Sequence, residues 1–81
     1  MLTIVNLQKE IIDIISTISK LPPEKIHENS DILELGLDSL SWLDVLSAVE
    51  KRFFIQIPDD QLSEMRKVKD IVHIVEKLLK S

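Results

Sequence analysis

Apolar residues return every three or four positions in three separate stretches of this chain. In the first stretch they are Ile4, Leu7, Ile11, Ile14, Ile15 and Ile18. In the second they are Trp42, Leu46, Val49 and Phe53, and in the third they are Val68, Ile71, Val72, Val75, Leu78 and Leu79. This spacing is typical of one apolar face on an α-helix. The pattern therefore predicts three substantial amphipathic helices.

The segment between the first two helices is predicted to be a long, ordered loop. The first helix should end near Leu21, because Pro22 disfavours helical geometry in the residue before it. The loop then runs from Pro22 to Leu37 and carries apolar anchors for the core, which are Ile26, Ile32, Leu33 and Leu35. Long connections of this kind are usually functional when they are ordered. Gly36 is expected to supply a backbone conformation that a side chain would resist.

A short helix is predicted ahead of the last long one. Residues 53–57 alternate as a strand does, but no partner strand exists elsewhere, so they are interpreted as a loop. Pro58 and Asp59 are typical of a helix start, with Asp59 as N-cap, and they predict about six helical residues that end around Met65. The fold class is then all-α, a small four-helix bundle with three main helices and one short helix. Residues 1–81 are expected to form a single domain.

The start of the last helix is predicted to be weak. Lys67 is a poor N-cap, and its charge opposes the helix dipole. Asp70 in the first turn compensates only in part. Fraying is therefore expected here.

Charge is divided unevenly along the chain. Residues 1–60 carry eleven acidic and five basic side chains, whereas residues 61–81 carry three acidic and five basic ones. A net acidic chain with one Trp, two Phe and no Tyr repels nucleic-acid phosphates and offers no stacking surface. No apolar stretch is long enough to span a bilayer, and the start lacks a basic leader. We expect a cytoplasmic monomer that neither binds nucleic acid nor inserts into membranes.

The chain offers little to metal or thiol chemistry. It contains no cysteine, which excludes disulfides, thiolate catalysis and cysteine-ligated zinc. His27 and His73 have no supporting carboxylate at fixed spacing, so no metal site is predicted.

The polar residues of greatest interest are Asp38 and Ser39, which follow the loop. As a nucleophile, Ser39 would need a base in reach, but neither histidine is placed there by spacing and the Gly-x-Ser-x-Gly motif is absent. As a helix start, Asp38 is a good N-cap whose carboxylate complements the positive helix end. An exposed hydroxyl at that end also suits phosphoester formation by another enzyme. A catalytic serine is disfavoured, whereas capping and attachment both stay open.

The chain resembles the acyl carrier protein family in two linked motifs that lie within a match of nearly its whole length. They are Asp31-Ile-Leu-Glu-Leu-Gly-Leu-Asp-Ser-Leu and Val49-Glu-Lys-Arg-Phe-Phe-Ile-Gln-Ile-Pro-Asp. The resemblance implies that Ser39 accepts 4′-phosphopantetheine from coenzyme A through a separate phosphopantetheinyl transferase. It implies that Asp38 helps to hold magnesium in the transferase complex. It also implies that Leu40 lies beside the attached phosphopantetheine, which is called the arm below. It also implies a carrier with no catalytic activity of its own.

The resemblance further implies that partner enzymes bind along the second helix. The partners are the transferase, an acyl- or aminoacyl-loading ligase and downstream acyl-transfer enzymes. The candidate contact residues are Leu37, Asp38, Leu40, Ser41, Asp44, Glu50, Lys51 and Arg52. Ser41, Lys51 and Arg52 stand where carriers of fatty acids usually have acids. Either they form an ordinary solvated surface, or the partners of this protein carry matching acids.

The same resemblance implies an apolar chamber inside the bundle that holds the acyl chain, and it indicates which residues line this acyl chamber. They are Trp42, Leu46, Leu62, Met65 and Ile71. Trp42, Leu62 and Ile71 are larger than the family's usual residues. They are either ordinary core residues or side chains that fill the chamber, which would leave the cargo short, polar or outside the bundle.

The leading interpretation is a discrete acyl carrier protein of fatty acid, polyketide or specialised lipid biosynthesis. An aminoacyl or peptidyl carrier loaded by an adenylating ligase would have the same fold and arm. An unmodified helical adaptor is the alternative from another functional class.

Overall fold

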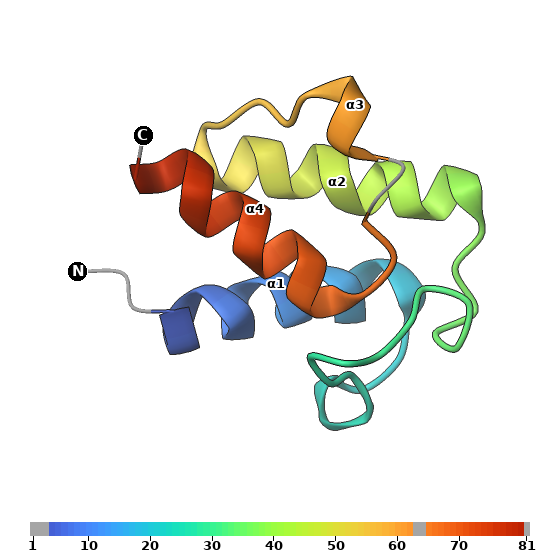
Figure 1. The fold of residues 1–81 in the computed structure, drawn as a ribbon. Helices are drawn as coiled ribbons and strands as arrows, with labels where there is room; N and C mark the ends of the chain where they lie inside the picture. The colour runs from blue at the N-terminus through green and yellow to red at the C-terminus, as the bar shows by residue number, and fades with distance from the viewer. Residues whose placement is uncertain (1–3, 63–64, 81) are drawn as a thin grey trace.

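The fold is a bundle of three long helices and one short one. The computed structural model describes residues 4–62 and 65–80. These residues form α1 (Ile4–Ser19), the 3-10 helix η1 (Pro23–Lys25), α2 (Ser39–Phe53), α3 (Asp59–Leu62) and α4 (Val68–Lys80). Helix α1 packs against both α2 and α4 (Figure 1). The predicted all-α four-helix bundle is confirmed. No helix in the two described ranges is long and apolar enough to cross a bilayer.

The core is made from the apolar faces that the periodicity predicts. Its most deeply buried side chains are Ile11 and Ile15 of α1, Val45 and Val49 of α2, and Val68, Ile71 and Val75 of α4. Each of these helices has its charged residues on the opposite face. Burial of apolar surface is the main favourable contribution to folding, so these three faces drive the assembly of the bundle.

Helix α1 ends at Ser19, slightly before the predicted end at Leu21. Lys20 takes a left-handed conformation with φ 65°, and its amide donates to the carbonyl oxygen of Ser16 at 2.9 Å. The Ser16 hydroxyl donates to the carbonyl oxygen of Leu21 at 2.6 Å. The helix end is thus closed before the chain reaches Pro22, as expected from the constraint that proline places on its predecessor.

The long loop is tied to the start of α4 by backbone hydrogen bonds. The Val68 amide donates to the carbonyl oxygen of Ser30 at 3.2 Å, and the Ile32 amide donates to that of Arg66 at 2.9 Å. The first amides of a helix have no partner within the helix, so acceptors supplied by the loop satisfy them. The predicted order of this loop is confirmed.

The start of α4 is better capped than the sequence predicts. Asp70 Oδ2 accepts from the amides of Arg66 at 3.1 Å and Lys67 at 3.0 Å, which is the reciprocal part of a capping box. The Lys69 amide donates to the carbonyl oxygen of Glu28 at 2.9 Å. The expectation of a weak, frayed start is therefore wrong, because the missing cap is replaced by the loop and by Asp70.

Most of the predicted loop anchors lie in the core. Ile26 and Leu35 are buried, and Ile32 packs against the core while partly exposed. The prediction for Leu33 is wrong, because its side chain is 68% exposed. Gly36 has φ 72°, and a Cβ at this position would meet no atom within 4 Å. The left-handed backbone alone, and not a lack of space, therefore favours glycine there.

The short helix between α2 and α4 differs from the prediction at both of its ends. Residues 54–57 form a loop as expected, but the prediction of a loop is wrong for Phe53, which is the last residue of α2. Helix α3 begins at Asp59, which is thus a helical residue and not the N-cap, and it ends at Leu62. Met65 lies outside the helix, and residues 63–64 of the predicted segment are outside the described residues. Among the described residues, the predicted helical segment is confirmed for Asp59–Leu62 and is wrong for Met65.

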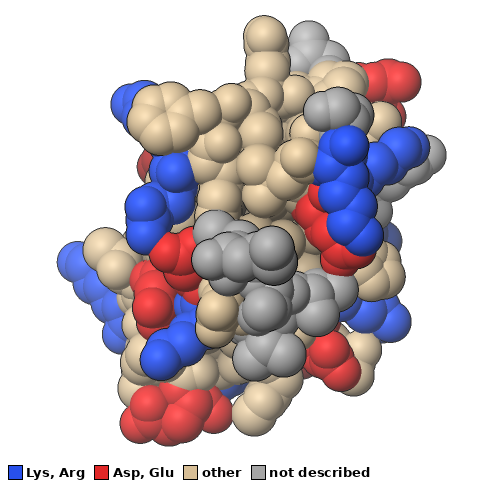
Figure 2. Space-filling view, turned by 90° about the vertical axis from the view of Figure 1, so that its left-hand side faces the viewer, with Lys and Arg blue, Asp and Glu red and all other residues tan. Residues whose placement is uncertain are grey.

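The residue that follows the last turn of α2 is aromatic and has an unusual backbone conformation. Phe54 has φ 56° and ψ 46°, and its amide donates to the carbonyl oxygen of Glu50. Its side chain is 94% exposed. Figure 2 shows the end of the molecule towards which α2 runs, where an uncharged area lies between Lys and Arg side chains. Glycine is the usual residue at such a helix end, because a side chain in the left-handed region is strained.

Replacing Phe54 with glycine is expected to stabilise the protein. Removing the side chain relieves strain of about 1 to 2 kcal/mol, and the greater freedom of glycine when unfolded offsets roughly 0.5 to 1 kcal/mol of that. The free energy of unfolding in urea should therefore rise by up to about 1.5 kcal/mol. Phe54→Ala is the matched control, since it removes the ring but keeps the strained Cβ. An equal gain in both variants would contradict this explanation.

Candidate functional site

Asp38 closes the N-terminus of α2. Its backbone is extended, with φ −90° and ψ −177°, and its Oδ1 accepts from the Ser41 amide at 2.8 Å. Its carbonyl oxygen accepts from the Trp42 amide at 2.9 Å. The hydrogen bond from the Ser41 amide, followed by the Ser41 side chain, lowers the pKa of Asp38 from its ordinary value of 3.8. The predicted N-cap is confirmed.

Removing this cap should destabilise the protein in a pH-dependent way. Asp38→Ala is expected to lower the urea midpoint near neutral pH, whereas Asp38→Asn should retain most of it, because asparagine caps as well as aspartate. Since the folded pKa is lowered, the stabilisation is fully present above the unfolded pKa of 3.8 and is lost as pH falls through the folded value. The difference between wild type and Asp38→Ala should shrink in acid. A constant difference across that range would contradict an ionised cap.

Ser39 is the first residue of α2, and its side chain is exposed. Within the described ranges its hydroxyl has no hydrogen-bond partner. Leu40 beside it is 74% exposed. The amides and the positive dipole end of a helix of 15 residues favour negative charge at this position. The hydroxyl is therefore accessible to another enzyme, in surroundings that suit a phosphoester.

Three of the predicted partner residues have roles inside the protein. Leu37 is only 4% exposed, so the prediction that it contacts partners is wrong: its side chain anchors the loop in the core. Glu50 Oε2 accepts from the Ile57 amide at 2.7 Å and holds the loop after α2. Arg52 forms an ion pair with Glu10 of α1.

The other predicted partner residues lie at the surface near Ser39 or further along α2. Leu40, Asp44 and Lys51 are exposed, and Ser41 is half-buried. The sequence analysis missed Leu43, which is 47% exposed. The signal was available, because Leu43 is one residue off the apolar stripe of the helix. An exposed leucine four positions after Ser39 lies on the same helix face as the hydroxyl.

The five chamber candidates lie together in the apolar interior. Trp42, Leu46, Met65 and Ile71 are buried in one core cluster, and Leu62 packs against it while partly exposed. The Nε1 atom of Trp42 is buried and has no acceptor among the residues that the structure describes. The interior near Ser39 thus holds one donor with no partner.

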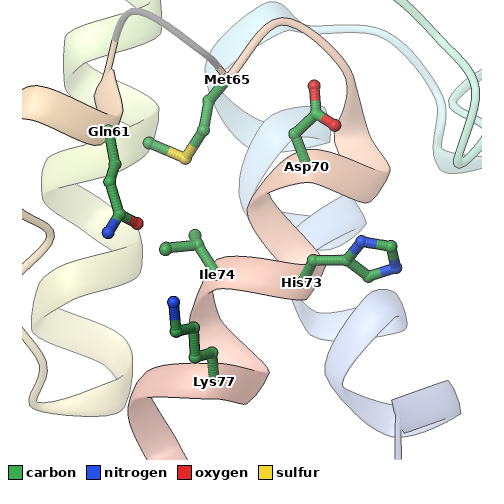
Figure 3. Close-up of a pocket in the computed structure, with 6 residues that line it drawn as sticks. All are labelled: Gln61, Met65, Asp70, His73, Ile74 and Lys77. Atoms are coloured by element: carbon green, nitrogen blue, oxygen red, sulfur yellow. The ribbon is translucent and has the colours of Figure 1, made fainter.

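A cavity of about 220 Å³ lies between α3 and α4. Its lining residues are Gln61, Met65, Asp70, His73, Ile74 and Lys77. Figure 3 shows Gln61, Met65, Ile74 and Lys77 converging on this space, whereas Asp70 and His73 point away from it. Among the described lining residues, Met65 is the one chamber candidate, and it also belongs to the buried core cluster that contains Trp42.

Comparison with known families decides the family to which the chain belongs. A family model described as "Phosphopantetheine attachment site" matches residues 9–75, a range that contains Ser39 and most of the bundle. The chain belongs to the acyl carrier protein family. Its role is therefore that of an acyl carrier, and 4′-phosphopantetheine is the cofactor of this family.

Individual carriers are similar over most of this chain. An acyl carrier protein homolog of Mycoplasmopsis pulmonis is 41% identical over 63 residues, which are 78% of this chain and 86% of the relative. An acyl carrier protein of Thermobifida fusca is 35% identical over 75 residues, or 86% of this chain and 95% of the relative. A clavatol synthase of Penicillium crustosum is 31% identical over 74 residues, 91% of this chain but only 3% of the synthase.

The residues at the start of α2 fit the family's prosthetic group. A phosphodiester needs a hydroxyl that is accessible and not engaged elsewhere, and Ser39 meets both conditions within the described part of the chain. The helix N-terminus stabilises the phosphate charge. When bound, the group supplies a terminal thiol, which this cysteine-free carrier lacks.

Proposed function

We propose that Ser39 bears 4′-phosphopantetheine and that the loaded protein carries acyl intermediates of fatty acid or polyketide-type synthesis as thioesters. The exposed, unengaged hydroxyl at the first residue of α2 is the observation that carries this proposal. The relatives named acyl carrier protein support an acyl cargo, and the similarity to a stretch of a clavatol synthase extends the range to synthases of that kind. Residues 1–81 act in this proposal as one domain.

The modification is a phosphoryl transfer from coenzyme A. The Ser39 oxygen forms a bond to the phosphorus next to the pantetheine. The bond that breaks joins this phosphorus to the oxygen that bridges it to the second phosphate, the one attached to the adenosine. The hydroxyl proton passes to a base of the transferase, and adenosine 3′,5′-bisphosphate leaves. The carrier contributes position and electrostatics only, and it catalyses no step itself.

Asp38 has a second role in this proposal. Its carboxylate is ionised at neutral pH, because its pKa is lowered, and one of its oxygens accepts from the Ser41 amide. A carboxylate oxygen next to the reacting serine suits the magnesium ion that accompanies coenzyme A on a transferase. Asp38 thus holds the helix start and helps to orient the incoming phosphate.

The partner surface in this proposal is the exposed face of α2 that contains Ser39. Leu40 and Leu43 offer apolar contact beside the arm, and Asp44 and Lys51 offer charges further along. Of the two cations that replace the usual acids, Arg52 is paired with Glu10, whereas Lys51 has no ion-pair partner within the described ranges. A partner with a carboxylate opposite Lys51 is favoured.

Intact mass and peptide mapping test the proposal directly. The protein is incubated with coenzyme A, magnesium and a broad-specificity phosphopantetheinyl transferase, and one arm per chain is expected. Proteolysis and fragment masses should place the arm on Ser39. An unchanged mass, or an arm on another residue, would contradict the assignment. Loading of the product by an amino acid ligase, with no loading by acyl ligases, would overturn the acyl cargo.

A further inference from the structure

The side chain of Trp42 carries the least explained polar atom in the described part of the protein. It is 6% exposed, and its Nε1 atom is the one buried side-chain nitrogen or oxygen there that has no hydrogen-bond partner. A buried donor without an acceptor is costly, and native proteins rarely keep one without a reason. Phenylalanine would fill much of the same apolar space without that cost. The indole N–H therefore calls for an acceptor that residues 4–62 and 65–80 do not supply.

The position of Trp42 relates this donor to Ser39. The two residues are three positions apart on α2, so their Cβ atoms are neighbours on the helix. Long side chains on a helix lean toward its N-terminus and cover the preceding turn. The indole thus extends from the core toward the end of the helix where Ser39 lies. If a group attached to Ser39 folds back against the bundle, the part of it nearest to Ser39 therefore lies close to the indole.

The surroundings of Trp42 explain why a purely apolar chain would not satisfy the donor. The buried core cluster that contains Trp42 also contains Leu46, Met65 and Ile71, and its apolar members offer contact to alkyl groups but no side-chain oxygen or nitrogen acceptor. An alkyl chain would leave Nε1 as it is, without a partner. A carbonyl or hydroxyl oxygen on the cargo would accept its hydrogen in a region shielded from water, where such a bond is strongest.

We propose that Trp42 Nε1 donates a hydrogen bond to an oxygen of the acyl cargo, and that the protein thereby prefers 3-oxoacyl or 3-hydroxyacyl groups over saturated ones. This inference rests on the proposed attachment at Ser39. It makes Trp42 a specificity-determining residue at the edge of the interior. The larger side chain at this position then serves as a polar contact for short, oxygenated chains in addition to filling space.

The test uses the single tryptophan of the chain as its own reporter. Four forms are prepared with the transferase from coenzyme A, butyryl-, 3-hydroxybutyryl- and acetoacetyl-coenzyme A, and loading is verified by mass. The single indole N–H signal is then followed by ¹H–¹⁵N NMR. A downfield shift and about five-fold slower exchange with water are expected with the two oxygenated cargoes, as for one hydrogen bond of ordinary net strength. The butyryl form should resemble the unacylated form.

Trp42→Phe is the matched variant, since it keeps an aromatic ring but has no donor. In the wild type the oxygenated forms should melt at a higher temperature than the butyryl form, and in Trp42→Phe this difference should vanish. Ile11→Val, a small change at a core residue of α1 that is not a chamber candidate, should preserve it. If Trp42→Phe does not fold, as judged by circular dichroism, the NMR comparison in the wild type decides alone.

The possible failures are distinguishable. If mass shows no loading of Ser39, the proposed function itself is wrong. If loading is complete and the indole signal is the same in all four forms, the carrier assignment stands and the role of Trp42 is overturned. A full shift already present in the unacylated form would place the acceptor in the arm, and an equal shift with butyryl would place it at the thioester. Either result would overturn a preference for oxygenated chains.

Discussion

Ser39→Ala is expected to abolish the gain of a phosphopantetheine arm completely. The reaction needs an accessible hydroxyl at the start of α2, and alanine removes only that oxygen. The bundle should be unaffected, because the Ser39 side chain makes no hydrogen bond within the described ranges and alanine is a better helix former than serine. The intact mass after incubation with coenzyme A, magnesium and transferase measures the effect.

Ser41→Ala is the matched control for this experiment. Ser41 lies on the same turn of α2, but it is half-buried and its amide is held by Asp38. The arm should still be added to this variant in full. An arm on Ser39→Ala, or its loss from Ser41→Ala alone, would move the attachment point away from Ser39. Urea midpoints of both variants, read from Trp42 fluorescence, verify that the fold is intact.

Ile15→Ala is expected to remove a large part of the stability of the protein. Ile15 is fully buried on α1, the helix that contacts both α2 and α4. Truncation of a buried isoleucine costs about 2 to 5 kcal/mol, through lost apolar burial and the cavity that is left. A domain of this length has a free energy of unfolding of about 4 to 12 kcal/mol. The variant should therefore lose at least roughly a sixth of its stability, and about 40% at the middle of both ranges.

Urea titration of Trp42 fluorescence measures this loss. Thr17→Ala is the control on the same helix: its side chain is exposed and donates only to the carbonyl oxygen of Asp13 at 3.0 Å. Its free energy of unfolding should change by about 0.5 kcal/mol or less. If Ile15→Ala were as mild as Thr17→Ala, α1 would not be the central helix of the bundle.

The helices were predictable because each depends on a local signal. The apolar spacing in residues 4–19, 39–53 and 68–80 matches the faces that are buried. The Asp38 cap was predictable for the same reason, since its carboxylate bonds to an amide three residues away. The family motif around Ser39 is the basis for the proposed attachment site, because no physical signal in the sequence could separate it from an ordinary helix start.

The errors fall where distant segments meet. Lys67 predicts a weak helix start, but Glu28 and Ser30, far away in sequence, supply the acceptors that α4 needs. Leu37 and Leu33 are both leucines of one loop, yet one is buried and the other exposed. The backbone path of the loop makes that choice, and hydropathy cannot. Phe54 was missed as well, because its exposure depends on a left-handed helix end that favours glycine.

The sequence by itself therefore determined the helices, the capped start of α2 and the presence of an attachment motif, because these follow from contacts within a few residues. The tertiary structure decided which side chains are available to partners. It assigned Glu50 and Arg52 to internal bonds, placed Leu37 in the core and left Leu43 at the surface. It also left the Trp42 donor without an acceptor among the residues that are described. Burial and hydrogen-bond partners arise between segments that are distant in sequence, so only the folded chain contains this information.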